Sequence, residues 1–286
     1  MKVVVIGANG QLGSDVCREL RSKGIEVVDV NHDQMDVTNL QQASDVLRSR
    51  RPKIVINTAA MHNVERCEEN PLKSFEINGV GARNLALLSN ECGFTLVHFS
   101  TDYVFDGCKK SPYVETDSPK PLNVYGNSKL AGEYFVQTVS RRYFVLRVSG
   151  LYGVNPCRAK SGLNFVKLML KLARERDEVR VVDDEILAPT YTADVAKQVL
   201  ALVGCENYGL YHATAQGSCS WYEFAARIFE LTGTKVNLQV ASPGEFPAKV
   251  PRPKYSVLEN RNLKSLGLDI MPHWEAGLKN YLRMLT

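Results

Sequence analysis

The chain has 286 residues, 44% of them hydrophobic and 23% charged, so it can bury a sizeable core and is not expected to be disordered. This length allows one large domain or a domain with a dependent lobe, and it excludes three ordinary domains. The net charge of +4 is small for a nucleic-acid binder. No stretch approaches the roughly 18 apolar residues of a membrane span, and the seven scattered cysteines include no C-x-x-C pair. We therefore expect a cytoplasmic globular protein with reduced thiols, no disulfide framework and neither nucleic acid nor membrane as a partner.

The first half of the chain alternates short β-branched runs with segments of helical spacing. Strands are expected at residues 2–6, 25–30, 53–57, 94–99 and 143–148. Helices are expected at residues 11–23, 40–50, 70–91 and 126–140. This alternation predicts right-handed βαβ units, and hence an α/β, doubly wound parallel sheet of the Rossmann type with helices on both faces.

After about residue 150 the alternation loosens. Helices are expected at residues 163–174, 192–203 and 220–232, and strands at 178–182 and 209–213. A capping box at Ser220 and Glu223 opens the third helix, and prolines 243, 247, 251 and 253 predict a structured loop. No flexible linker divides the chain. We expect residues 1–150, with 189–213 returning to them, to bind a dinucleotide, and residues 151–188 and 214–286 to form a smaller substrate lobe.

A glycine loop, G-x-x-G-x-x-G, lies between the first strand and the first helix, with glycines at Gly7, Gly10 and Gly13. Such glycines allow a tight turn, and the N–H groups of the helix that follows hold a pyrophosphate. Asp29, at the end of the second strand, is expected to accept the ribose hydroxyls and to repel a 2′-phosphate. No arginine follows Asp29 closely, so NADH is slightly favoured over NADPH. Asp36 either lies beside the adenine or caps the next helix.

Two segments carry candidate catalytic residues. Ser100-Thr101-Asp102 follows the fourth strand, at the carboxyl edge where open α/β sheets bind ligands. Tyr125 and Lys129 are four residues apart at the start of a helix and so share one face. A cation about 4 Å from the phenol is expected to lower its pKa by up to about three units. Tyr125 then exchanges a proton with a carbonyl oxygen, and Thr101 hydrogen-bonds that oxygen.

The blocks Gly7–Gly13, Ser100–Gly107 and Pro121–Lys129 resemble the dTDP-4-dehydrorhamnose reductase family of extended short-chain dehydrogenases. The likeness continues through Asn57–Ala60, Ala188–Thr190, Gly209–His212 and Arg252-Pro253. It implies reduction of the 4-keto group of a nucleotide-linked deoxy sugar by NADH or NADPH, with Thr101, Tyr125 and Lys129 as catalytic residues. By position, the resemblance also assigns cofactor contacts to Gly10, Gln11, Leu12, Asp29, Asp36, Val37, Ala59, Ala60, Met61 and Phe99, and substrate contacts to Thr101 and Asp102.

Two features depart from the family pattern. Gly150 stands where the bacterial rhamnose enzymes usually carry a tryptophan beside the sugar. Some family members form metal-linked dimers through acidic residues, for which the candidates here are the run Asp183-Asp184-Glu185 and Glu259. Neither a metal nor a homodimer is established by the sequence, and we assign no metal ligands. Arg252, between two prolines, is the candidate for the substrate diphosphate.

Two alternatives remain open. One is another reductase or epimerase of the same superfamily. A sugar dehydratase is less well supported, because Tyr103 stands where dehydratases carry a glutamate after the Thr-Asp pair. The other is a non-catalytic regulatory subunit resembling the methionine adenosyltransferase β subunit, which shares the Asp-Tyr-Val-Phe-Asp-Gly block.

Overall fold

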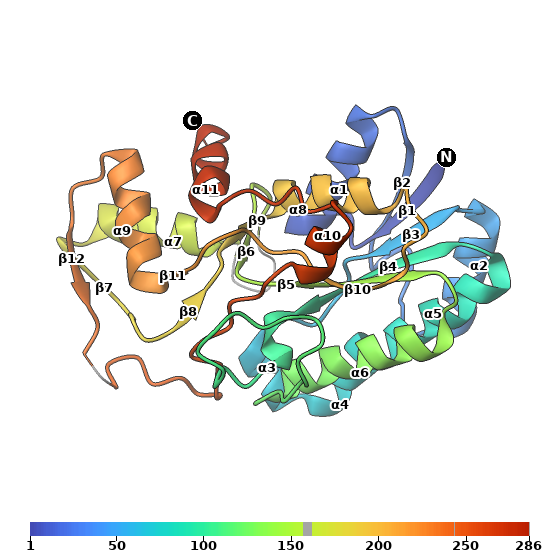
Figure 1. Ribbon diagram of the computed structural model, residues 1–286, viewed down its shortest axis with the longest axis horizontal. Coiled ribbons are helices and arrows are strands. Elements are labelled where there is room, and N and C mark those ends of the chain that lie inside the picture. Colours follow the sequence, from blue (N-terminus) through green and yellow to red (C-terminus); the bar gives the residue numbers. More distant parts are fainter. Residues whose placement is uncertain (157–161, 243, 286) are drawn as a thin grey trace.

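The computed structural model describes residues 1–156, 162–242 and 244–285 (Figure 1). Cys157, one of the seven cysteines, and Pro243, the first proline of the predicted loop, lie outside the described residues. In the described part, no helix is long and apolar enough to cross a membrane.

The described residues form a main sheet of six parallel strands in the order β10-β5-β4-β3-β1-β2. Its strands are β1 (Lys2–Ile6), β2 (Glu26–Val30), β3 (Ile54–Asn57), β4 (Thr95–Thr101), β5 (Tyr143–Val148) and β10 (Gly209–His212). The inner strands β1 and β3 are runs of buried aliphatic residues, as expected for a sheet covered on both faces. Their carboxyl ends meet at one edge, which carries the candidate site.

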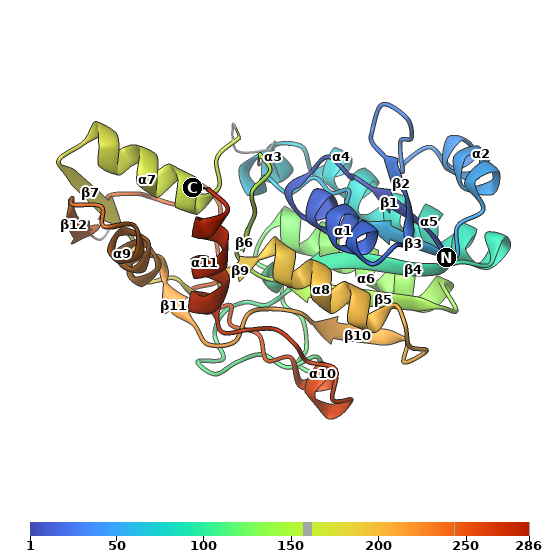
Figure 2. The same ribbon diagram turned by 90° about the horizontal axis from the view of Figure 1, so that it is seen from above.

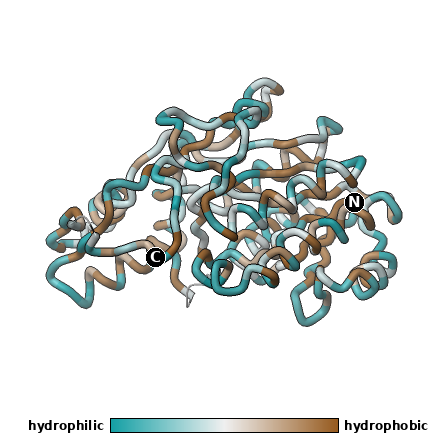
Figure 3. The backbone as a smooth tube through the Cα atoms, turned by 90° about the horizontal axis from the view of Figure 1, so that it is seen from below, coloured by the Kyte–Doolittle hydropathy of each residue, from teal (hydrophilic) through white to brown (hydrophobic). Residues whose placement is uncertain are grey.

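Helices cover both faces of this sheet (Figures 1 and 2). On one face α1 (Gln11–Ser22) and α8 (Thr192–Leu202) pack their apolar residues against the strands. On the other face lie α2 (Leu40–Arg50), α5 (Gly81–Cys92) and α6 (Val124–Val139). Hydrophobic residues follow the central strands, and hydrophilic ones dominate the peripheral loops (Figure 3). The predicted doubly wound Rossmann sheet is confirmed.

The helix expected at residues 70–91 is interrupted. It comprises α4 (Pro71–Phe75), a π-helical segment η1 (Glu76–Val80) and α5. A further helix, α3 (Val64–Glu69), precedes it and was not expected; the side chain of Asn63 caps it by accepting the N–H of Arg66 at 2.9 Å. The π-helical segment contains Asn78, whose buried side chain reaches back to the loop after β3. Such segments are often found near functional sites.

The second core is built from α7 (Phe165–Glu175), α9 (Trp221–Thr232) and α11 (Trp274–Arg283) around β7 (Glu178–Val181) and β12 (Asn237–Val240). Two short pairs connect it to the sheet: β6 (Leu151–Tyr152) with β9 (Thr190–Tyr191), and β8 (Ile186–Leu187) with β11 (Cys219–Ser220). The remaining elements are η2 (Asp102–Val104) and α10 (Arg261–Ser265). The sequence did not predict β12, α10 or α11, nor these two-residue strands, which are too short to show a period.

Candidate active site

The glycine loop leaves the start of α1 open to a ligand. Gly7 has φ +76°, and a Cβ added at Gly13 would lie 2.2 Å from the Gly7 carbonyl oxygen, so neither position accommodates a side chain without distortion. Gly10 is the N-cap of α1 and supplies no side-chain hydrogen bond, and the first turn carries no acid. The helix therefore directs uncapped N–H groups and its positive dipole end toward the cavity, which fits the pyrophosphate of a nicotinamide dinucleotide.

A cavity of about 610 Å³ runs along the carboxyl edge of the sheet, from this loop to α6 and on to α7 and α9. Its wall contains most of the site residues expected from sequence. From the glycine loop and the strand ends these are Gly7, Gly10, Gln11, Leu12, Gly13, Asp36, Val37, Ala59, Ala60 and Phe99. From the catalytic and substrate sets they are Thr101, Asp102, Tyr125, Lys129 and Gly150. One continuous cavity thus holds residues from both expected roles.

Thr101 ends β4 inside this cavity and is buried. Its hydroxyl accepts the N–H of Tyr103 at 3.2 Å and donates to a carboxylate oxygen of Asp102 at 3.0 Å. Ser149, at the end of β5, donates to the other oxygen of Asp102 at 2.8 Å. Burial raises the pKa of Asp102 although these hydrogen bonds act against it. Asp102 thus fixes the orientation of Thr101.

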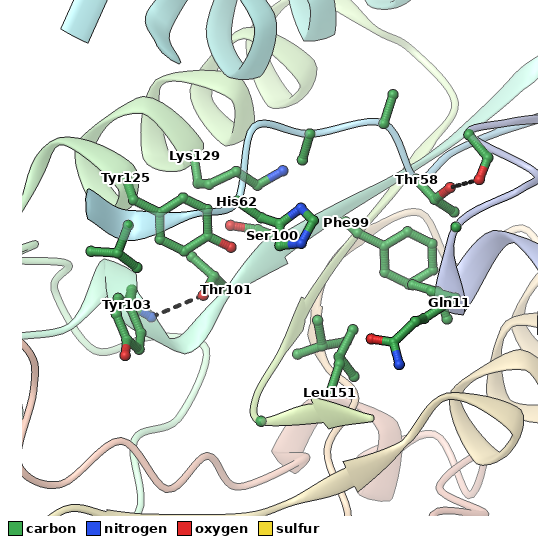
Figure 4. Close-up of a pocket in the computed structure, with 18 of the residues that line it drawn as sticks. Gln11, Thr58, His62, Phe99, Ser100, Thr101, Tyr103, Tyr125, Lys129 and Leu151 are labelled. Atoms are coloured by element: carbon green, nitrogen blue, oxygen red, sulfur yellow. Dashed lines mark hydrogen bonds between the residues drawn. The ribbon is translucent and has the colours of Figure 1, made fainter. Parts of the chain in front are cut away.

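Tyr125 and Lys129 project from the first turns of α6 into the cavity, and the Tyr125 phenol points toward Thr101 (Figure 4). The helix begins where it does because the side chain of Asn123 caps it, accepting the N–H of Gly126 at 2.9 Å. Gly126 lets the helix approach the β4 end closely, since a Cβ there would lie 2.3 Å from the Tyr103 carbonyl oxygen. These two residues set the position of the Tyr125 phenol.

Burial controls the protonation of both side chains. It raises the pKa of Tyr125 above the ordinary value of a phenol, and a hydrogen bond with Thr101 only partly opposes it. The expectation that this pKa is lowered is therefore wrong for this structure, because burial removes the water that would stabilise a phenolate. Burial also lowers the pKa of Lys129 to about 8, against the opposing effect of the Glu133 carboxylate. At neutral pH the pair is a neutral phenol beside an ammonium ion.

Asp29 does not line the cavity, contrary to expectation. Its side chain points toward α1, where it accepts hydrogen bonds from Arg21 at 2.7 Å and from the thiol of Cys17 at 3.2 Å. Successive strand residues face opposite sides of a sheet, and Asp29 lies on the same side as Val27, which packs in the α1 core. No arginine follows Asp29 closely in the sequence, but Arg21, which precedes it, reaches Asp29 from α1, so an arginine does lie near this carboxylate.

Met61 and Arg252 also lie outside the cavity wall. The backbone of Met61 is held by Asn78, which accepts its N–H and donates to its carbonyl, both at 2.9 Å. Arg252 forms an ion pair with Glu65 of α3, so its guanidinium is already engaged by an acid. Its neighbour Pro253 does line the wall, which leaves Arg252 close to the cavity rim.

Two buried groups that the sequence reasoning missed hold α6 in place. Glu133, four residues after Lys129, accepts two hydrogen bonds from Arg147 of β5, at 2.8 and 2.7 Å, and both side chains are at most 3% exposed. Asn78 donates to the hydroxyl of Ser128 at 2.9 Å and so joins α6 to the Met61 loop. The sequence did contain a signal for Glu133, because Tyr125, Lys129 and Glu133 follow one another at four-residue spacing and so lie on one face of the helix.

The part of the cavity that is lined by α7 and α9 is aromatic. Phe165 of α7 and Trp221 of α9 lie with ring centroids 4.5 Å apart, and the indole N–H of Trp221 donates to Glu185 at 3.1 Å. Gly150 lines the same space with φ +53°, and a Cβ there would lie 2.7 Å from a methyl carbon of Leu187. A side chain at position 150 would thus require rearrangement, and Gly150 supplies no indole at the position where the resembled enzymes usually carry tryptophan.

In the described ranges, no group of three or more His, Cys, Asp or Glu side chains is arranged to hold a metal ion. The acidic candidates for a metal-linked dimer each have a partner within the chain. Asp183 accepts from Ser220, Asp184 pairs with Lys254 at 2.8 Å, Glu185 accepts from Trp221, and Glu259 pairs with Lys264 at 2.6 Å.

Comparison with known proteins identifies the family of this chain. The profile of the RmlD substrate binding domain matches residues 1–286. The chain is 40% identical to the spore coat polysaccharide biosynthesis protein SpsK of Bacillus subtilis, over 99% of this chain and 97% of the relative. It is 35% identical to dTDP-4-dehydrorhamnose reductase of Escherichia coli, over 100% of this chain and 98% of the relative.

A solved structure extends the agreement to three dimensions. The dTDP-4-dehydrorhamnose reductase of Bacillus anthracis, crystallised with NADP, superposes with a TM-score of 0.93 at 41% identity, over 99% of each chain. Full-length coverage in both sequence and structure excludes a match confined to the common Rossmann part. As its motifs predicted, the chain belongs to the dTDP-4-dehydrorhamnose reductase (RmlD) family.

Proposed function

We propose that this protein reduces the 4-keto group of a nucleotide-linked 6-deoxy sugar at the expense of NADH or NADPH, with dTDP-4-dehydro-L-rhamnose as the substrate and dTDP-L-rhamnose as the product. The observation that carries the proposal is the single cavity shared by the open glycine loop, Thr101, Tyr125 and Lys129. The named reductases among the relatives support the enzymatic function over a non-catalytic subunit.

The proposed proton donor is Tyr125. Its raised pKa keeps the phenol protonated at neutral pH, as an acid that must give up a proton requires. A reduced nicotinamide, when bound in this cavity, would supply the hydride for the carbonyl carbon. Tyr125 donates its proton to the carbonyl oxygen, which becomes the new hydroxyl. The Thr101 hydroxyl, once it turns away from Asp102, donates a hydrogen bond to the same oxygen. The ammonium of Lys129 stabilises the phenolate that remains after proton donation.

The proposed division of labour follows the chain. Residues 1–150 together with 189–213 bind the dinucleotide, and residues 151–188 and 214–286 bind the sugar nucleotide. The aromatic pair Phe165 and Trp221 offers a wall on which a base can stack, since offset rings attract one another. Arg252 receives the diphosphate after leaving Glu65, exchanging one anionic partner for another. The space beside Gly150 admits variation at the sugar.

The test is a panel of nucleotide-linked 4-keto sugars, each incubated with NADH and with NADPH. Oxidation of the cofactor is followed by absorbance, and the reduced sugar is identified by mass spectrometry. Turnover of dTDP-4-dehydro-L-rhamnose with a kcat/KM above that of every other member supports the proposal. Higher kcat/KM on another nucleotide or sugar reassigns the substrate, and no turnover by protein that binds cofactor contradicts the enzymatic function.

A further inference from the structure

One part of the cavity, which we call the chamber, is lined by the segment after β2. Its wall contains His32, Met35, Asp36 and Val37, together with Ile77 of η1. Met35 and Val37 are buried, so they offer a firm apolar surface for a flat ring. Asp36 accepts hydrogen bonds from the N–H of Thr38 at 2.9 Å and from its hydroxyl at 2.8 Å, which fixes the orientation of the carboxylate. This chamber has the character of an adenosine site.

The residue directly after β2 is not the carboxylate that selects NADH in many Rossmann proteins. An acid that accepts both ribose hydroxyls stands at the carboxyl end of the second strand, and it repels a 2′-phosphate. Here the residue directly after β2 is Asn31, whose side-chain oxygen accepts the N–H of Asn9 in the glycine loop at 3.1 Å. Next comes His32, which lines the cavity. The nearby acid of the strand, Asp29, faces α1 and is paired with Arg21.

We propose that His32 recognises the 2′-phosphate of NADPH and makes this protein prefer NADPH over NADH. The inference rests on the proposed function, because it takes the cavity to be the dinucleotide site. An imidazole donates a hydrogen bond in either charge state, and a phosphate dianion is a strong acceptor. The side chain is exposed on a turn, so it meets the phosphate at the water-facing rim and not in the core. In this proposal His32, and not Asp29, determines which of the two cofactors is preferred.

Lys73 of α4 lines the same chamber and adds positive potential there. Its ammonium is already paired with Glu76 at 2.9 Å. We therefore expect Lys73 to attract a phosphate only through its charge and not to form a hydrogen bond with it. Arg21 provides a matched comparison, because it is a cation near the same strand that does not line the cavity.

The test measures binding of 2′,5′-ADP and 5′-AMP by calorimetry, which requires no turnover. Wild-type protein is expected to bind 2′,5′-ADP at least about tenfold more tightly than 5′-AMP, the scale of one hydrogen bond to a charged group. His32→Gln should reduce that ratio and His32→Asp should bring it below one, with 5′-AMP affinity nearly unchanged in His32→Gln. Arg21→Gln should keep the wild-type ratio. Melting temperatures of all variants establish that the fold is retained.

Three outcomes would overturn the inference, and a fourth would overturn the proposed function. A wild-type ratio near one, or a ratio unmoved by both His32 variants, removes His32 as the selector. An equal loss of preference in Arg21→Gln assigns the effect to overall charge. Failure of wild-type protein to bind either nucleotide contradicts the proposed dinucleotide site itself, and so separates failure of the proposed function from failure of this inference.

Discussion

Replacing Glu133 by glutamine should change both stability and the pH dependence of activity. Glu133 and Arg147 are at most 3% exposed and are joined by two hydrogen bonds, so the substitution leaves a buried guanidinium without its counter-charge. Breaking a buried pair costs about 3–5 kcal/mol, and glutamine, which keeps one acceptor, should fall near the lower end of that range. Urea denaturation of both proteins measures this difference in the free energy of unfolding, provided that the m value is the same for both.

The same substitution acts on Lys129. Its pKa of about 8 predicts that kcat/KM falls as the pH rises through about 8, where the ammonium loses its proton. The Glu133 carboxylate raises that pKa, so Glu133→Gln should move the basic limb of the profile to lower pH. A purely structural role would lower stability without moving the limb.

A matched control is available on the surface. Glu178 pairs with Arg180 at 2.9 Å, and both side chains are more than 40% exposed. Glu178→Gln should therefore cost no more than about 1 kcal/mol and leave the pH profile unchanged. The reasoning is refuted if Glu133→Gln unfolds with a free energy within 1 kcal/mol of wild type, or if the basic limb stays in place.

Tyr125→Phe should lower kcat at least ~100-fold with dinucleotide affinity retained, because only the proton donor is removed; near wild-type turnover would contradict the assignment. Arg252→Ala should cost about 1.5–3 kcal/mol in kcat/KM with little change in cofactor affinity, measured by steady-state kinetics, and unaltered kinetics would return Arg252 to the surface. Gly13→Ala places a Cβ 2.2 Å from the Gly7 carbonyl oxygen and should destabilise the protein by about 1–3 kcal/mol and weaken cofactor binding. Gly204→Ala, where a Cβ meets nothing within 4 Å, is its control, and equal melting temperatures and cofactor affinities for the two variants would contradict the close approach.

Local sequence was sufficient for the features that depend on neighbouring residues. The alternation of β-branched runs and helical spacing predicted the doubly wound sheet, because each βαβ unit has one favoured hand. The glycine spacing predicted the tight turn at Gly7, where φ is +76°. The four-residue spacing of Tyr125 and Lys129 placed both side chains on one helix face, and both line the cavity. Their catalytic roles, and the division of the chain into two functional parts, stay predictions.

Tertiary structure decided the features that depend on distant residues. Asp29 faces α1 because alternation along an edge strand, together with the docking of Arg21, turns it away from the cavity. Arg252 is engaged by Glu65, which is remote in sequence and is brought near only by folding. The Tyr125 pKa is raised, not lowered, because burial depends on how completely the whole chain excludes water from the phenol, and spacing along a helix contains no measure of that exclusion.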